Sequence, residues 1–170
     1  MTGPLEFFTE PLPKFRFLVA LGPAVAHLPP TQTALLALTA QGAFQQVTGI
    51  GAQLEVLAYP EGGVNDRVRQ FPVRHSWNRI VLHRGVARGP SLWDWYQTGL
   101  ADPLGARRSG AVVLLDAAGL PGAVWAFRRG LASKWTGPDL HAERSEVALE
   151  QLEIAHEGLV SVRQEGLELG

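Results

Sequence analysis

The sequence predicts a mainly β fold, a small β-sandwich or barrel of antiparallel strands with one α-helix. Short stretches with alternating apolar side chains recur along the 170 residues, and such alternation is typical of half-buried strands. The chain also contains 19 glycines and 12 prolines, which stand between these stretches as turn signals. Only one segment carries the signals of a helix, so we expect a β-sandwich or barrel with a single helix attached.

The amino-terminal third predicts three strand pieces and a long irregular segment. Residues 14–21, KFRFLVAL, alternate apolar side chains from Phe15 to Leu21, as a half-buried strand does. Residues 22–42 contain several prolines and one small apolar piece, and we interpret them as a long loop with room for a short helix. Residues 44–59 then predict two strands, interrupted at Gly49 and Gly51 by a bulge or bend.

The middle of the chain predicts a long polar loop followed by a strand. Residues 59–72, YPEGGVNDRVRQFP, hold two glycines and two prolines. This stretch is too long for a tight turn, and loops of such length are usually functional or mobile. Residues 77–86, WNRIVLHRGV, predict the next strand.

Residues 90–99, PSLWDWYQTG, predict the helix. Ser91 can cap its first turn, Asp94 suits the first turn, and Gly99 can end it. The side chains expected to form its apolar stripe are Leu92, Trp93 and Tyr96.

A hairpin is predicted next, from two apolar stretches at 111–115 and 123–127 with the turn DAAGLPG between them.

Composition and charge place the chain among globular proteins and exclude several classes. Hydrophobic residues make up 46 % and charged residues 18 %. The net charge of -1 argues against a general nucleic-acid binder. The absence of cysteine excludes disulfides, thiolate metal sites and cysteine nucleophiles. No apolar run reaches the roughly 18–20 residues of a membrane span, and no secretory signal is expected at the amino terminus.

Charge is unevenly distributed along the chain. Residues 67–88 hold six arginines and no acid, whereas residues 139–170 hold eight acids against Arg144 and Arg163. Three interpretations remain open. The charges form a nucleic-acid patch beside an acidic tail, or two complementary surfaces that meet between copies, or they interleave within one fold.

The stretch EVALEQLEIAHEGL, residues 146–159, contains an E-x-x-H pair. On a helix, Glu150, Glu153 and His156 would converge on a metal ion. A di-iron site needs a second E-x-x-H and four helices, and the sequence predicts neither. The apolar residues instead alternate and change phase, as at a β-bulge. We therefore predict a bulged strand at 146–157 without a metal or other cofactor. Its Glu150, Glu153 and Glu157 are expected largely on solvated or interface faces.

The other polar motifs indicate no reaction. Gly49 and Gly51 do not extend to G-x-G-x-x-G. Neither a carboxylate nor a second histidine lies at ligand spacing from His75, His83 or His141, and Ser145 lacks a G-x-S-x-G elbow. The sequence predicts neither catalytic residues nor an enzyme.

Six phrases of the sequence carry a resemblance to a known family. They are FQQVTGIGAQLEVLAYPEGGVNDRVRQFP, IVLHRGV, SLWDWYQTG, RRSGAVVLLDAAGLPGAVWAF, KWTGPDLHA and EVALEQLEIAHEGL. In this order they resemble the tube proteins of contractile phage tails and phage-tail-like contractile injection systems. The match runs from Phe44 to Leu159 and includes the strand at 14–21.

The resemblance implies a structural inner-tube subunit. Proteins of this family form hexameric rings that stack into a hollow tube inside a contractile sheath. Each subunit is a small β-sandwich with one helix, and strands of neighbouring subunits join into a continuous barrel lining the lumen. The expected partners are further copies of the chain, the sheath protein, baseplate and spike proteins, and effector cargo or DNA in the lumen. Neither membrane insertion nor specific nucleic-acid binding is expected.

The resemblance also suggests where subunits touch. The residues expected at the interface come from the family's protruding loop and its carboxy-terminal phrase: Glu61, Gly62, Gly63, Asn65, Arg67, Arg69, Glu150, Glu153, His156 and Glu157. Assembly is expected in the cytoplasm of a bacterial cell, within a particle that is released or ejected.

The family usually has a short connection where this chain has residues 22–42. We therefore expect one tube-protein domain over 1–170 with an inserted loop at 22–42. Two alternatives stay open: a tube-end initiator or adaptor that joins the tube to the spike or baseplate, and a soluble β-sandwich binding module or effector.

Overall fold

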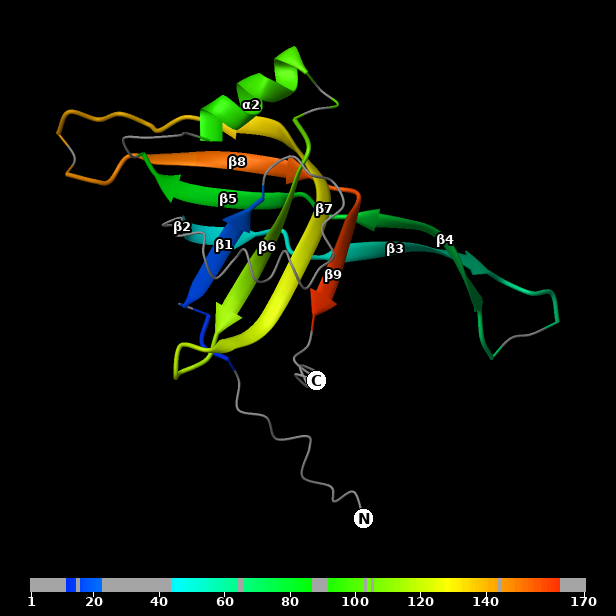
Figure 1. Ribbon diagram of the computed structural model, residues 1–170. Helices are drawn as coiled ribbons and strands as arrows, with labels where there is room; N and C mark the ends of the chain where they lie inside the picture. Colours follow the sequence, from blue (N-terminus) through cyan, green and yellow to red (C-terminus); the bar gives the residue numbers. More distant parts are fainter. Residues whose placement is uncertain are drawn as a thin grey trace.

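The computed structural model describes residues 12–14, 16–22, 44–63, 66–86, 92–102, 104, 106–143 and 145–162. The strands and the helix follow one another along the chain as shown in Figure 1. Their bounds are β1 (Phe17–Leu21), β2 (Phe44–Thr48), β3 (Ala52–Tyr59), β4 (Arg69–Trp77), β5 (Ile80–Gly85), α2 (Leu92–Ala101), β6 (Arg108–Leu115), β7 (Pro121–Thr136), β8 (Leu149–Ala155) and β9 (Gly158–Val162). The mainly β fold with one helix is confirmed for these residues.

Seven strands form one bent sheet in the order β1-β6-β7-β8-β5-β2, with β9 paired beside β7. Strand β7 is 16 residues long and belongs to both halves of this sheet. Its first half pairs with β6 and β9, and its second half pairs with β8. Between the halves, Arg129 has a φ of 52°. A positive φ takes the backbone out of the extended course, so β7 bends there and the sheet folds over itself (Figure 1).

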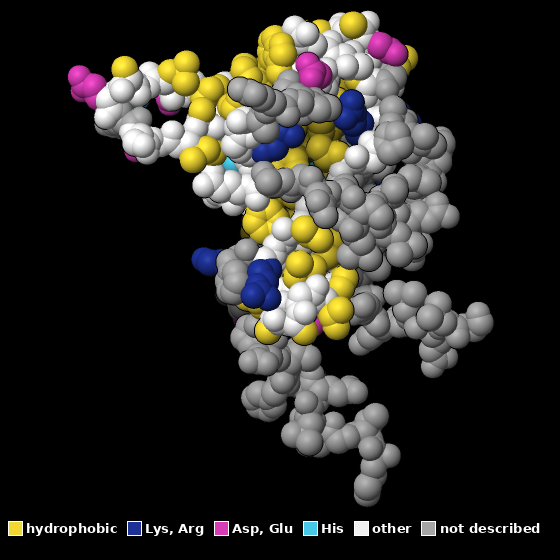
Figure 2. Space-filling view, turned by 60° about the vertical axis from the view of Figure 1, so that its left-hand side comes forward, with side chains coloured by type: hydrophobic (Ala, Val, Ile, Leu, Met, Phe, Trp, Pro, Cys, Tyr) yellow, Lys and Arg dark blue, Asp and Glu magenta, His cyan; other side chains and the backbone are white. Residues whose placement is uncertain are grey.

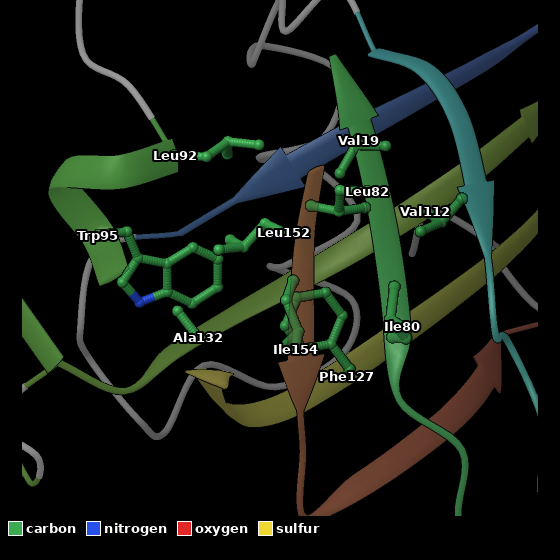
Figure 3. Packing of buried hydrophobic residues seen from close by; sticks show 10 residues of the cluster. All are labelled: Val19, Ile80, Leu82, Leu92, Trp95, Val112, Phe127, Ala132, Leu152 and Ile154. Atoms are coloured by element: carbon green, nitrogen blue, oxygen red, sulfur yellow. The ribbon is translucent and has the colours of Figure 1, made fainter. Parts of the chain in front are cut away.

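The hydrophobic core is built from side chains of the bent sheet together with α2, as Figure 3 shows. Its buried members are Val19, Ile80, Leu82, Leu92, Trp95, Val112, Phe127, Ala132, Leu152 and Ile154. The ring of Trp95 is 2 % exposed, and its Nε1 donates a 2.8 Å hydrogen bond to the carbonyl oxygen of Ala106. The one polar atom of this large ring is therefore satisfied, as burial requires.

The predicted helix is present, but its buried face differs from the predicted stripe. Leu92 and Trp95 are buried, whereas Trp93 is 36 % exposed. Positions three apart share a helix face, and this places Trp95, rather than Trp93, beneath the helix with Leu92. Trp93 instead lies against the rings of Tyr96 and Trp135 at its edge.

The strands expected at 14–21, 44–59, 77–86 and 111–127 are found as β1, β2 with β3, β5, and β6 with β7. Strand β1 is not half-buried, however. Val19 and Ala20 point to opposite faces and each is 1 % exposed. Ala20 packs into a second apolar cluster with Ala111 and Val113 of β6, so both faces of this strand are covered.

Two strands were not predicted. Residues 69–72, expected in a loop, begin β4, and residues 158–162 form β9. Strand β4 contains Pro72, which opposes Val56 where the register shifts. Proline is tolerated at such a bulge because no ladder hydrogen bond is needed from it.

The strand expected at 146–157 is found, in shorter form, as β8. Its register with β5 runs without a break from Ile80↔Ile154 to Gly85↔Leu149, so the predicted bulge within this strand is wrong. The irregularity lies on β7 instead, between Ala132 and Lys134. The alternation of apolar residues changes phase in the sequence for another reason. Val147, at the start of this alternation, precedes the strand and is 73 % exposed.

The proposed insertion at 22–42 lies outside the described residues, apart from Gly22, whose amide donates to the carbonyl oxygen of Ser109. Ser91 and Asn65 also lie outside them.

Candidate assembly interface

Strands β3 and β4 form an arm that projects from the body of the molecule (Figure 1). They pair with each other and with no other strand of the described topology. The arm continues the β2–β5 pair outward, because β2 leads into β3 and β4 leads into β5. An isolated two-stranded hairpin is marginally stable in water, so a protein that projects one needs something to support it.

The arm exposes apolar side chains along its length. Seven large hydrophobic side chains on it are between 46 % and 58 % exposed: Leu54, Val56, Leu57, Tyr59, Val68, Phe71 and Val73. Leu57 and Phe71 face each other across the strands, and the Phe71 ring meets Tyr59 edge-on at 6.2 Å. Alternation along β3 places Leu54 and Val56 on one face of the arm and Leu57 and Tyr59 on the other, so both faces expose apolar side chains. Exposed apolar surface on both faces of a hairpin indicates a site where another molecule packs.

The base of the arm is held by close backbone contacts. The amide of Asn78 donates a 3.1 Å hydrogen bond to the carbonyl oxygen of Gly51. His156 lies next to this point, with Nε2 3.0 Å from the carbonyl oxygen of Asn78 and Nδ1 3.2 Å from that of Gly158. Its ring also approaches the ring of Trp77 at 5.9 Å. His156 therefore links the β8–β9 corner to the base of the arm within one chain.

We expect His156→Ala to lower the free energy of unfolding by about 1–2 kcal/mol, because it removes the polar contacts with two carbonyl oxygens. The arm should also lose protection from hydrogen exchange more than β6 and β7 do. Exchange measured by mass spectrometry on dilute protein would test this. His141→Ala, which changes an exposed histidine, is the control. Equal exchange of the arm in both variants would contradict the role of His156.

The predicted interface residues of the protruding loop lie at the tip of the arm. Glu61, Gly62, Gly63 and Arg67 all lie near the turn between β3 and β4. Arg69 Nε is 2.6 Å from Glu61 Oε2, with both side chains about half exposed. Arg69 is thus engaged within its own arm, whereas Arg67 is exposed.

Glu150, expected on a solvated or interface face, is instead 3 % exposed, and that expectation is wrong. It shares the inward face of β8 with Leu152 and Ile154. Its Oε1 accepts hydrogen bonds from Arg84 at 2.7 and 3.2 Å, and its Oε2 accepts one from Trp135 Nε1 at 3.0 Å. Burial of the carboxylate is tolerated because both of its oxygens are paired.

Glu153 and Glu157 lie at more open positions, and both form ion pairs within the chain. Glu153 is 3.4 Å from Arg79 and 3.5 Å from Lys134, and Glu157 contacts Arg107 and Arg129. Glu153 and Glu150 point to opposite faces of β8, as the strand conformation requires. Within the described ranges, no three histidine or acidic side chains come together as a metal site would need; the absence of a metal stays a prediction.

Pairing of β5 with β8 explains much of the charge asymmetry. Arg79 meets Glu153 and Arg84 meets Glu150 across this pairing. These contacts support the interpretation in which charges of the two segments interleave within one fold.

Sequence reasoning predicted β3 but missed β4, the second strand of the arm. The signal was present in QFPVRHSW, where Phe71 and Val73 alternate with polar residues, but Pro72 and the charges obscured it. The helix of the described chain is neither long nor apolar enough to cross a membrane.

Comparison with known proteins gives one family. The family model for the T4-like virus tail tube protein gp19 matches residues 13–160. A comparison with curated protein sequences gives no match.

Several solved structures share the fold. A chain of the 6-fold symmetrised cryo-EM structure of the anti-feeding prophage (AFP) baseplate is 24 % identical with a TM-score of 0.75, over 93 % of this chain and 99 % of that one. A chain of the PVC sheath-tube complex, an extracellular contractile injection system in the extended state, is 19 % identical with a TM-score of 0.71, over 91 % and 93 %. A chain of the anti-feeding prophage tube-terminating cap is 18 % identical with a TM-score of 0.71, over 92 % and 93 %.

Proposed function

This chain belongs to the T4-like virus tail tube protein gp19 family, and from this premise we propose that it forms the inner tube of a contractile phage-tail-like injection system. In this proposal, hexameric rings of the chain stack around a lumen through which cargo or DNA passes. Residues 1–170 act as one tube-protein domain, with 22–42 as an insertion.

The observation that carries the proposal is the exposed apolar arm. A chain that stays monomeric would leave six large hydrophobic side chains of β3 and β4, together with the neighbouring Val68, in water. In a ring, a neighbouring copy covers them and supports the two-stranded arm. One repeated contact between two different patches closes a ring when the rotation between copies allows it. A shared barrel also removes the free edges of β3 and β4.

Structures of similar fold support the same kind of assembly. They come from a sheath-tube complex and from a 6-fold symmetrised baseplate. We propose by analogy that the sheath protein surrounds this tube, that baseplate and spike proteins meet its end, and that assembly takes place in a bacterial cell as part of the particle.

Replacing Leu57 and Phe71 by serine should abolish rings and tubes while the body of the molecule stays folded. The two side chains are opposed on the arm and are 56 % and 46 % exposed, so the change removes contacts between copies rather than core contacts. Light scattering after size exclusion, with negative-stain micrographs, would measure assembly. Leu120→Ser, at a 62 % exposed leucine of the β6–β7 turn, is the matched control.

Tubes of normal length from the arm variant would contradict the role of the arm. A wild-type protein that stays monomeric at every concentration, even with sheath and baseplate partners, would contradict the tube function and favour a soluble binding module.

The tube-end alternative rests on the shared fold with chains of a baseplate and of a tube-terminating cap. Micrographs separate the two functions. A tube subunit gives stacks of many rings, whereas a tube-end adaptor stops at one or two rings unless another tube protein is added.

A further inference from the structure

Four arginines gather at one corner of the molecule, where β6 begins, β7 bends and β8 turns into β9. Arg107 and Arg129 both contact Glu157, whose amide donates a 3.0 Å hydrogen bond to the carbonyl oxygen of Arg128. The guanidinium of Arg108 lies over the ring of Trp95 at 5.2 Å, and burial lowers the pKa of Arg108. We name Arg107, Arg108, Arg128, Arg129 and Glu157 the basic corner.

The basic corner presents a positive charge beside exposed leucines. Among the described residues of this corner, the four arginines are accompanied by two acids, Glu157 and Asp102 in the preceding turn, so +4 and -2 leave +2. The side chain of Arg128 is exposed, and it forms no ion pair with the other described residues. Leu100 and Leu104, from the end of α2 and the turn after it, are 66 % and 79 % exposed. The surface thus combines apolar and cationic groups.

The loop between β7 and β8, residues 137–148, has the opposite character. Asp139, Glu143 and Glu146 are exposed on it, and with Arg144 the loop carries -3 + 1 = -2. Leu140 and Val147 are 80 % and 73 % exposed. Figure 2 shows the loop projecting at the upper left with hydrophobic and acidic side chains along it. A cavity of about 210 Å³ lies against the loop, lined by Asp139, Leu140, His141, Glu146, Val147 and Ala148.

The loop and the basic corner cannot meet within one chain. The loop enters β8 at Leu149, and Glu157 follows the other end of this strand. Seven strand residues separate them by about 20 Å. Figure 1 accordingly shows the loop at one side of the molecule and the β8–β9 turn at the other. Two unlike patches on opposite sides are what a head-to-tail contact between copies requires.

We propose that the 137–148 loop of one copy docks on the basic corner of the next copy around the ring. The proposal rests on the ring assembly proposed above and names a second contact in it, separate from the arm. Leu140 and Val147 cover Leu100 and Leu104, and the acids of the loop face Arg128 and its neighbours. The apolar contacts supply most of the affinity, and the opposite charges set orientation and register.

Two variants test the contact from its two sides. The loop variant carries Leu140→Ser and Glu146→Lys, and the corner variant carries Leu104→Ser and Arg128→Glu. Each should raise the concentration at which half of the chains are in rings by about tenfold or more, since each removes an apolar contact and reverses a charge. Lys14→Glu, a charge reversal at an exposed position elsewhere, should leave assembly unchanged. Far-ultraviolet circular dichroism confirms that each variant is folded.

A mixture of the two variants gives the sharper result. The loop variant keeps an intact corner, and the corner variant keeps an intact loop. Equimolar mixing at a concentration where each alone is monomeric should therefore give 1:1 dimers, held by the intact loop of one chain and the intact corner of the other. Likewise, Glu146→Arg combined with Arg128→Glu in one chain should assemble better than either single change. Wild-type-like rings from both variants alone would overturn this contact while leaving the tube function intact. Failure of the wild type to form rings would instead refute the tube function itself.

Discussion

Glu150→Ala is expected to lower the free energy of unfolding by about 2–4 kcal/mol, among the largest effects of any single change in the described chain. The carboxylate is 3 % exposed and accepts hydrogen bonds from Arg84 and Trp135. Its removal leaves the guanidinium of Arg84, whose side chain is 18 % exposed, without its carboxylate. The loss comes less from the pair itself than from a largely buried guanidinium that has lost its carboxylate partner.

Urea unfolding of dilute, unassembled protein would measure this loss. Glu150→Gln keeps the shape and one acceptor oxygen, so it should lose roughly half as much. Glu153→Ala, on the same strand, is the control. Its partners Arg79 and Lys134 are each 61 % exposed, so it should lose only about 0–1 kcal/mol. Equal losses for Glu150 and Glu153 would show that the buried network has no special role.

Glu150 also shows where sequence patterns fail. In EVALEQLEIAHEGL four glutamates recur at intervals of three and four, and nothing local distinguishes a buried one from a solvated one. The distinction depends on Arg84, 66 residues away, and on Trp135 across the β7–β8 pairing. Such partners become visible only when strand order is known.

The sequence predicts best those strands and helices whose signals lie within the element itself. Alternation identified β1, β2, β3 and β5, and the signals at 90–99 identified α2. Strand β4 was missed because its extended conformation depends on pairing with β3. In our proposal it also depends on a second copy that covers its exposed apolar side chains. The predicted subunit contacts came from the family resemblance. Neither the sequence pattern nor the resemblance predicted the basic corner, because Arg107, Arg129 and Glu157 come together only in the fold.

Gly49→Ala is the second change expected to have a large effect, and it acts at the base of the arm. Gly49 has a φ of +79°, and an added Cβ would lie 1.9 Å from the carbonyl oxygen of Arg79. The obstacle is backbone at the β4–β5 connection, which cannot swing aside as a side chain would. We expect a loss of about 2–4 kcal/mol in the free energy of unfolding, together with a displaced arm and failure to form tubes.

Gly51→Ala is the matched control, since its Cβ would meet the end of the Asn78 side chain at 3.0 Å at an ordinary φ. Thermal unfolding and negative-stain micrographs of both variants decide the point. If Gly49→Ala melts and assembles like Gly51→Ala, the close approach of Gly49 to the carbonyl oxygen of Arg79 does not hold the arm in place.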